Sequence, residues 1–275
     1  MILVNGISGT EVSVFDRGLA YGDGLFETIA VVGGDVLNWQ RHMNRLAKGC
    51  RQLAIDVPDS ARLYEETQMV AEGFERSVVK LVVTRGDGGL GYTPPTAASA
   101  TRIVARRPWP EGYPERERSG IRVCVARHRL SSNAPLAGLK HLNRLDQVLA
   151  SMEIPASGAV EALMLDRDAR VIEGTRCNLF AVYPGRLVTP RLDQCGVRGV
   201  MRDVILELAP TVGLRGEETE LTLGDLQSAN EIFLSNAIAG IWPVIGLDAD
   251  PQRSVPIGAH TRRLQEALVA GGHRR

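Results

Sequence analysis

The feature that most constrains the fold is a stretch without periodicity near the middle of the chain. Residues 106–120, "RRPWPEGYPERERSG", hold three prolines, two glycines and many charged side chains. This composition, without apolar residues at helix or strand spacing, is typical of a linker. At 275 residues the chain is long enough for two domains. We therefore expect a small domain over residues 1–106, a linker over residues 107–119 and a larger domain over residues 120–275.

Short runs of alternating and β-branched residues dominate the first third of the chain. They predict strands in "ILVNG", in "LFETIAVVGGDVLNW" with a turn at residues 33–35, in "VVKLVVT" and in "ATRIVAR". A helix is expected over residues 40–54, which place their apolar side chains on one face. A second helix is expected after Asp59 and Ser60, which suit an N-cap. These elements together predict a small α+β domain.

Strand patterns dominate again beyond residue 120. We expect a strand in "GIRVCVARHRL", hairpins in "EALMLDRDARVIEG" and "NLFAVYPGRLVTP", and further strands in "EIFLSNAIAGIWPVIGL". Leu and Val at three- and four-residue spacing predict helices over residues 141–151, 200–209 and 259–270. The second domain is therefore expected to be a strand-rich structure with surrounding helices.

Composition narrows the class of partner. Lys plus Arg and Asp plus Glu number 32 each, so the overall charge does not favour nucleic acid or an anionic membrane, and a small-molecule ligand is expected. The four cysteines are too far apart for a zinc site or a disulfide framework, and the five histidines show no paired metal-ligand spacing, so we expect no metal. The N-terminus lacks a signal-peptide pattern and no long apolar run occurs, which predicts a cytoplasmic protein.

The sequence "GDGGLG" at residues 86–91 matches the G-x-G-x-x-G pattern of dinucleotide-binding folds. That pattern needs a helix that begins at its last glycine, so that helix amides face a pyrophosphate. Here "YTPPT" follows, and its two prolines oppose a helix. We therefore interpret "GDGGLG" as a mobile glycine loop or a loop of an active site.

A single lysine, Lys140, stands in "LAGLKHLNRLDQ" at residues 136–147, near an expected helix start. Most lysines in such places are solvated surface residues. A lysine that forms an imine must reach its unprotonated form near neutral pH, which requires desolvation or a nearby cation. The flanking leucines could supply the first condition and Arg144 the second, so Lys140 is a candidate for binding a carbonyl cofactor.

Such a cofactor would also need a carboxylate for a pyridine nitrogen and a cradle for a phosphate. Glu173 follows a short predicted strand in "IEGTRCNLF". A glycine-containing loop enters a helix near Val200, where free amides favour an anion, and the small residues of "LSNAIAG", 234–240, permit close approach of backbone amides. Arg45 lies off the apolar face of its helix and could be solvated or directed at a phosphate. Each feature alone also fits an ordinary turn, loop or surface residue.

The order of these features along the chain resembles that of the fold-type IV pyridoxal-phosphate enzymes, which include branched-chain and D-amino-acid aminotransferases and aminodeoxychorismate lyases. The matching landmarks are "DRGLAYGDGLFET" at 16–28, "RHMNRL" at 41–46, "EGTRCNLF" at 173–180 and "GVRGVMR" at 196–202. Residues 136–150 and 189–202 look most like the lyases, which make 4-aminobenzoate for folate synthesis. The resemblance implies an α/β chain with a small N-terminal α+β domain, a larger C-terminal β-barrel-like domain with helices, and a homodimer.

The resemblance also implies roles for individual residues. Lys140 would be the Schiff-base lysine and general acid-base, and Glu173 would partner the pyridine nitrogen of pyridoxal 5'-phosphate. Arg45 would bind the cofactor phosphate. Backbone amides would complete the phosphate site, at Val200, Met201, Asn236 and Ala237.

The sequence departs from the branched-chain aminotransferases at two places. Those enzymes have "FEG" where this chain has "FET", and we expect the Thr28 hydroxyl to position substrate or relay a proton. They also carry a tyrosine after the lysine that approaches the phenolic oxygen of the cofactor, where "KHLNRL" offers Asn143 or Arg144. A substrate with two carboxylates, such as aminodeoxychorismate, needs fixed cations or amide donors, and Arg85 and Tyr92 are candidates.

Two alternatives to a lyase remain at the level of sequence. An aminotransferase for D- or branched-chain amino acids would share the cofactor and the lysine, but Thr28 and the lyase-like residues 136–150 tell against it. A non-catalytic binding protein on the same scaffold is the other. It would have no need for both Lys140 and Glu173, so we expect an enzyme that eliminates pyruvate from aminodeoxychorismate.

Overall fold

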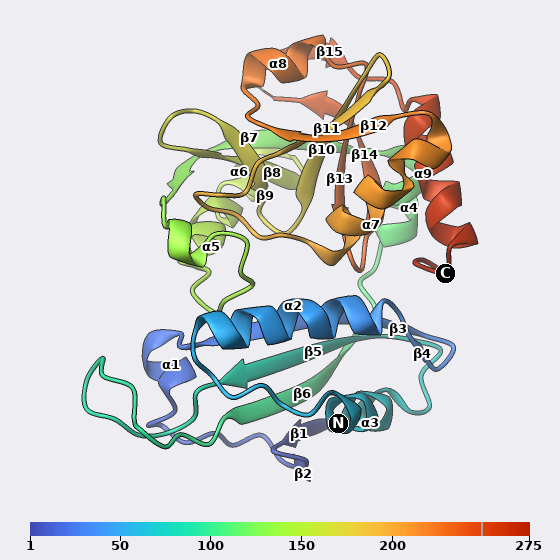
Figure 1. Cartoon of the computed structure of the whole chain (residues 1–275). Helices are drawn as coiled ribbons and strands as arrows, with labels where there is room; N and C mark the ends of the chain where they lie inside the picture. Colours follow the sequence, from blue (N-terminus) through green and yellow to red (C-terminus); the bar gives the residue numbers. More distant parts are fainter. Residues whose placement is uncertain (249) are drawn as a thin grey trace. The chain divides into compact units, whose positions relative to one another are not determined.

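The computed structural model of the chain describes residues 1–248 and 250–275, and for residues 250–254 it describes the backbone alone. The chain forms two units, each described here by itself (Figure 1). Unit 1 consists of Met1–Trp109 and Leu139–Asn143, and unit 2 consists of Pro110–Gly138 and Arg144–Arg275. No described helix is long and apolar enough to cross a membrane.

Unit 1 is an antiparallel sheet with helices packed on it (Figure 1). The strand order is β2-β1-β6-β5-β3-β4, so β6 and β5 lie at the middle of the sheet and β3 lies between β5 and the edge strand β4. Helix α2 packs against β3, and α3 packs against β5 and β6. The bounds are β1 (Ile2–Val4), β2 (Ile7–Ser8), α1 (Arg17–Tyr21), β3 (Gly24–Val32), β4 (Asp35–Val36), α2 (Trp39–Gln52), α3 (Ser60–Ala71), β5 (Arg76–Thr84) and β6 (Thr101–Pro108).

Local sequence explains these elements. Helix α2 buries side chains at three- and four-residue spacing, among them Met43 and Leu46, as the pattern over residues 40–54 predicted. Gly49 of α2 leaves room for Leu25 of β3, since a Cβ atom at Gly49 would lie 2.8 Å from Leu25 Cδ1. The Asp59 side chain accepts hydrogen bonds from the first amides of α3, so the predicted N-cap is confirmed.

Unit 2 is built around a closed barrel. The strand order is β12-β11-β10-β13-β14-β7-β8-β9, and β9 also pairs with β10, which closes the six strands from β10 to β9 into a ring. The bounds are β7 (Ile121–Leu130), β8 (Glu161–Asp166), β9 (Val171–Gly174), β10 (Asn178–Tyr183), β11 (Arg186–Pro190), β12 (Arg215–Thr219), β13 (Glu231–Asn236), β14 (Gly240–Leu247) and β15 (Asp250–Ser254), which pairs with β14.

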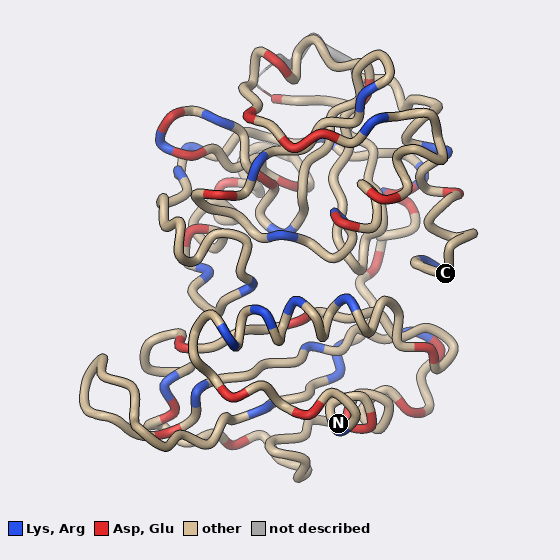
Figure 2. The backbone as a smooth tube through the Cα atoms, viewed as in Figure 1, with Lys and Arg blue, Asp and Glu red and all other residues tan. Residues whose placement is uncertain are grey.

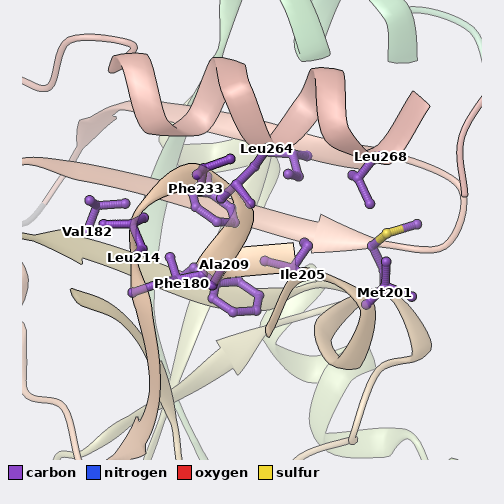
Figure 3. Packing of buried hydrophobic residues seen from close by; sticks show 13 residues of the cluster. Phe180, Val182, Met201, Ile205, Ala209, Leu214, Phe233, Leu264 and Leu268 are labelled. Atoms are coloured by element: carbon purple, nitrogen blue, oxygen red, sulfur yellow. The ribbon is translucent and has the colours of Figure 1, made fainter. Parts of the chain in front are cut away.

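Helices pack around this barrel. Phe180 of β10 and Phe233 of β13 are register partners with stacked rings 5.0 Å apart, and Ile205 of α7 and Leu264 of α9 belong to the same buried cluster (Figure 3). The bounds are α4 (Tyr113–Ser119), the 3-10 turn η1 (Ala134–Leu136), α5 (Leu145–Ser151), α6 (Ile154–Ser157), α7 (Val200–Leu208), the 3-10 turn η2 (Ala209–Val212), α8 (Leu223–Ser228) and α9 (Ala259–Ala270).

The fold class is confirmed: a small α+β unit and a larger barrel with helices, with α7 and α9 at the predicted positions. Two local expectations differ from the structure. The helix expected over 141–151 begins only at Leu145, because His141 forms a bridge with Leu25 of β3. The range 107–119, expected to be an irregular linker, contains α4, whose Tyr113 ring packs edge-on against Trp242 at 4.6 Å.

Candidate active site

Lys140 lies in unit 1, on a five-residue segment that pairs with β3. The Phe26 amide donates to the Lys140 carbonyl at 3.0 Å, and the Leu142 amide donates to the Gly24 carbonyl at 2.9 Å. The Lys140 ammonium lies 4.4 Å from the centre of the Phe26 ring. Leu139 is buried and Lys140 is half-buried. The backbone pairing therefore fixes the lysine, and the aromatic ring and burial replace part of its water.

Phe26 is the centre of a small polar cluster on one face of the sheet. Thr28 shares that face, because side chains alternate along a strand, and Lys80 of β5 is its register partner. The Lys80 ammonium lies 5.1 Å from the centre of the Phe26 ring. We call these four residues, Phe26, Thr28, Lys80 and Lys140, the Phe26 cluster. It contains two ammonium groups at one ring and a hydroxyl on the same face of β3.

A second cluster lies between β3 and α2 and is built on the buried carboxylate of Glu27. Arg45 donates from Nε to Oε1 at 2.8 Å and from Nη2 to Oε2 at 2.5 Å, and His42 Nδ1 lies 2.6 Å from Oε2. Burial opposes the charge on Glu27, but the charge of Arg45 and the hydrogen bond from His42 lower its pKa to about 2. Glu27 is therefore ionised at neutral pH.

The same surroundings set the state of His42. Burial lowers the pKa of His42, and the charges of Arg45 and Lys140 lower it too. Together these effects outweigh the hydrogen bond and charge of Glu27, which raise it. The imidazole is therefore neutral, and we assign its proton to Nδ1, which faces the Glu27 carboxylate. His42 Nε2 is buried without a hydrogen-bond partner among the described residues. His42 thus lies close enough to Lys140 for the charge of the lysine to affect its pKa.

Arg45 was expected off the apolar face of its helix. The structure places its side chain, which is 15% exposed, in a bidentate pair with Glu27. Figure 2 shows that basic residues recur along α2, but the Glu27 carboxylate fixes the guanidinium plane of this one. The expected contact with a phosphate remains a proposal.

Glu173 lies in unit 2, within β9 itself and not after it as expected. Its buried carboxylate accepts a hydrogen bond from the Val197 amide at 2.9 Å, and the side-chain amides of Asn178 and Gln147 each lie 3.5 Å from it. Asn178 is also its register partner, where β9 meets β10 to close the barrel. The carboxylate is thus held by donors on three separate segments.

The start of α7 lies next to this carboxylate site. Asn178 donates to the Val197 carbonyl at 2.8 Å, and a Cβ atom at Gly199 would lie 2.1 Å from Asn178 Oδ1. Only glycine therefore fits before Val200, the first residue of α7. The amides of Val200 and Met201 lie in the first turn, where no carbonyl one turn earlier can accept from them.

The loop between β13 and β14 is the other expected phosphate segment. Asn236 accepts hydrogen bonds from the amides of Ile238 at 2.9 Å and Ala239 at 2.7 Å. Its side-chain amide donates to the Arg176 carbonyl at 3.3 Å. The Asn236 side chain therefore shapes this turn, while the expected contacts of the Asn236 and Ala237 amides with phosphate remain a proposal.

Arg85 and Tyr92 were expected to contact substrate. Arg85 is buried, and its guanidinium donates to both carboxylate oxygens of Asp23 and to the carbonyls of Leu53 and Ala54. This geometry gives Arg85 a structural role in unit 1, which differs from the expectation. The Tyr92 side chain is 86% exposed.

Comparison with known proteins gives the family. The model of the amino-transferase class IV family matches residues 24–247. The chain belongs to this family. It is 36% identical over 270 residues to an aminodeoxychorismate lyase of Vibrio harveyi, covering 98% of this chain and 99% of that one. It is also 36% identical over 261 residues to a putative branched-chain-amino-acid aminotransferase of Methanocaldococcus jannaschii, covering 93% and 89%.

The fold agrees with a solved class IV relative. The crystal structure of 4-amino-4-deoxychorismate lyase from Pseudomonas aeruginosa superposes with a TM-score of 0.91 at 46% identity, and the match covers 98% of each chain. The chain is therefore a fold-type IV enzyme, and pyridoxal 5'-phosphate is the cofactor of this class.

The described residues fit this cofactor. Unit 1 supplies a half-buried lysine on an aromatic ring, and a lysine amine is what binds the cofactor carbonyl covalently. Unit 2 supplies a buried carboxylate and a helix start with open amides beside a glycine cradle. These are the groups that a pyridine nitrogen and a phosphate require.

The Glu27 cluster makes stability depend on pH. Because the folded-state pKa of Glu27, about 2, lies below the usual 4.5, its contribution is present above about pH 4.5 and is lost as the pH falls towards 2. We expect the unfolding free energy of the wild type to fall by about 2 kcal/mol more than that of Glu27→Gln between about pH 5 and pH 2.5. Urea unfolding followed by circular dichroism measures the difference, and parallel curves would contradict the assignment.

Proposed function

We propose that the chain is a 4-amino-4-deoxychorismate lyase, which eliminates pyruvate from aminodeoxychorismate and leaves 4-aminobenzoate. The observation that carries this proposal is the Phe26 cluster, in which the Lys140 amine and a second ammonium group lie at one ring. The Thr28 hydroxyl shares this face of the strand. A substrate with two carboxylates and a C–O bond to break needs a base, a fixed cation and a proton source. The full-length similarity to lyases supports the same reaction.

The chemistry follows from the groups present. When bound, pyridoxal 5'-phosphate supplies a carbonyl that takes up the substrate amine and a ring that withdraws electrons from the adjacent carbon. Lys140 then removes the proton from the carbon that bears the amine. The electron pair of that C–H bond becomes a ring double bond, while the neighbouring C–O bond breaks and its oxygen departs with the bonding pair. The ring becomes aromatic, which drives the elimination.

The remaining residues have supporting roles in this proposal. Glu173, held as a carboxylate acceptor by three donors, keeps the pyridine nitrogen protonated. Arg45 and the amides of Val200, Met201, Asn236 and Ala237 bind the phosphate. Thr28 relays the proton that Lys140 has taken up to the departing oxygen, which leaves as the enol of pyruvate.

Lys80 is our candidate for one substrate carboxylate. Its ammonium lies beside the same ring as that of Lys140, and it takes the place that sequence reasoning gave to Arg85. Tyr92 remains a candidate contact for the substrate, because its ring is exposed and is not part of the core of unit 1.

The alternative is an aminotransferase for branched-chain or D-amino acids, supported by the match to the archaeal relative. An apolar substrate side chain on the Phe26 cluster would displace water from the Lys80 ammonium without replacing its hydrogen bonds. That desolvation is unfavourable. The cluster therefore favours a substrate with a second carboxylate.

The reaction is tested with purified protein and aminodeoxychorismate generated in situ, without any keto acid. We expect 4-aminobenzoate and pyruvate in equal amounts. Lys140→Ala should lower the rate by about 10³-fold or more, because it removes the base and the covalent anchor. Amino transfer from leucine or D-alanine to 2-oxoglutarate, with no 4-aminobenzoate, would overturn the lyase assignment.

Substitutions at Thr28 and Lys80 should affect different kinetic constants, although the two residues are register partners on β3 and β5. Thr28→Val removes a proton donor and should lower kcat by about 10²-fold with little change in KM. Lys80→Met removes a charge-assisted hydrogen bond and should raise KM by about 10- to 100-fold. Steady-state kinetics on both variants check this, and an unchanged kcat for Thr28→Val would remove Thr28 from the mechanism.

We also propose a homodimer. Helix α5 carries a stripe of exposed apolar side chains at the spacing of one helix face, formed by Leu145, Val148, Leu149 and Met152. Contiguous apolar surface of this kind marks interaction sites, and a second copy of the chain is the partner that the family resemblance implies.

Light scattering on the eluting protein tests the dimer. We expect a mass of about twice 29.8 kDa for the wild type, and a monomer for Leu145→Glu with Leu149→Glu, because two buried carboxylates would oppose association. Met69→Glu, at an exposed apolar position on α3, is the matched control and should stay dimeric. A monomeric wild type would refute the proposal.

Location is a proposal as well. The four cysteines are all buried and unpaired, and burial raises the pKa of the Cys195 thiol to about 12. Free thiols persist in reducing compartments. We therefore propose the cytoplasm.

A further inference from the structure

The segment that contains "GDGGLG" is attached to one buried arginine. We call residues 86–93 the glycine loop. Arg17 of α1 donates from Nη1 to the carbonyls of Gly88 at 3.3 Å and Gly91 at 2.9 Å, and from Nη2 to the Tyr92 carbonyl at 3.1 Å. Its own backbone amide donates to the Gly86 carbonyl at 3.0 Å. Arg17 thus donates hydrogen bonds to carbonyl groups along the whole loop.

Arg17 is itself held in place. Its Nε donates to Asp23 Oδ2 at 3.0 Å, and the same carboxylate accepts from Arg85. Burial would raise the pKa of Asp23, but the hydrogen bonds and charges of Arg85 and Arg17 lower it. The carboxylate therefore stays ionised and anchors both guanidinium groups at neutral pH.

The loop would otherwise have many conformations. Its four glycines all have positive φ, from +57° at Gly91 to +112° at Gly88, and glycine loses more conformational freedom on ordering than any other residue. Backbone carbonyls directed at a guanidinium fork offset that cost. A lysine at this position could not do so, because a single ammonium cannot reach several carbonyls in one plane.

The result of this anchoring is a fixed Tyr92. Its carbonyl is bound to Arg17, and its ring lies 5.4 Å from that of Tyr21, over which the Arg17 guanidinium lies at 4.9 Å. Yet the Tyr92 side chain is 86% exposed. A network of buried charges therefore holds an aromatic side chain in a defined position in solvent.

We propose that Arg17 is a positioning residue for the lyase reaction: it fixes the glycine loop so that Tyr92 is presented to substrate before substrate binds. This proposal rests on the proposed function. Arg17 acts through the loop and does not touch the reacting atoms. In this proposal the loop is an ordered part of the binding surface. It differs in this from the mobile loop that its glycine content suggested.

A double-mutant cycle tests this pathway in the holoenzyme. Arg17→Lys should raise KM for aminodeoxychorismate about tenfold and leave kcat within about twofold, because ordering the loop then consumes binding energy. Tyr92→Ala should raise KM similarly. Adding Arg17→Lys to Tyr92→Ala should raise KM by no more than about twofold, since coupled residues are non-additive. Independent, multiplicative effects, or a loss in kcat alone, would overturn the proposal.

Arg102→Lys is the matched control. Arg102 is also a partly buried arginine of unit 1, and it forms a bidentate pair with Glu66. Among the described residues, its guanidinium forms no hydrogen bond or ion pair with the glycine loop. The Arg102→Lys variant should keep the wild-type KM for aminodeoxychorismate. A rise in KM equal to that of Arg17→Lys would show that loss of any such ion pair has this effect, and would overturn a specific role for Arg17.

Chymotrypsin tests the order of the loop independently of activity. Cleavage after Leu90 and Tyr92, read by mass spectrometry, should be at least about tenfold slower in the wild-type holoenzyme than in a free peptide of residues 84–96. Arg17→Lys should restore rapid cleavage and Arg102→Lys should not. If the wild type is cut as fast as the peptide, the proposal fails, even if Arg17→Lys does not fold. If the wild type makes no 4-aminobenzoate, the lyase assignment fails and the cleavage result still decides whether Arg17 orders the loop.

Discussion

The position of Lys140 depends on one backbone pairing. Two hydrogen bonds join the segment Leu139–Asn143 to the start of β3, and they bring the lysine to the ring of Phe26. Because β3 pairs with β5, the same pairing also brings Lys140 to the ring that Lys80 approaches. The charge of Lys140 also acts on His42. A short piece of extended chain therefore sets the surroundings of the amine that we propose as the Schiff-base group.

Each unit contains a buried carboxylate with an ordered set of hydrogen-bond donors. Glu27 orders Arg45 and His42 within unit 1, and Glu173 is ordered by donors from three segments of unit 2. Both are acceptors surrounded by donors, and for Glu27 the charge of Arg45 and the hydrogen bond from His42 lower the pKa in spite of burial. The ion pair of Glu27 with Arg45 fixes the geometry of both side chains.

Sequence periodicity predicted the elements, but contacts between distant residues decided the details. Helices α2, α7 and α9 follow their apolar spacing. Residues 141–144 do not, because pairing with β3 outweighs their helical pattern. Lys140 and Glu173 were proposed as site residues from their motifs. Glu27 and Lys80 were missed, since an isolated charge in a strand pattern is usually on the surface. The surroundings of Glu27 depend on side chains of α2, and those of Lys80 depend on a ring of β3. The backbone carbonyls that bind Arg85 likewise cannot be predicted from the sequence.

The path of the chain has a consequence for how such a protein can be divided. Unit 1 is completed by residues 139–143, which follow residues 110–138 of unit 2. Neither unit is therefore one continuous piece of the gene. A break near residue 110, where the chain first leaves unit 1, would give a first fragment without the segment that pairs with β3 and without its lysine. Recombination could exchange neither unit as an intact module, so both must evolve as parts of a single inherited sequence.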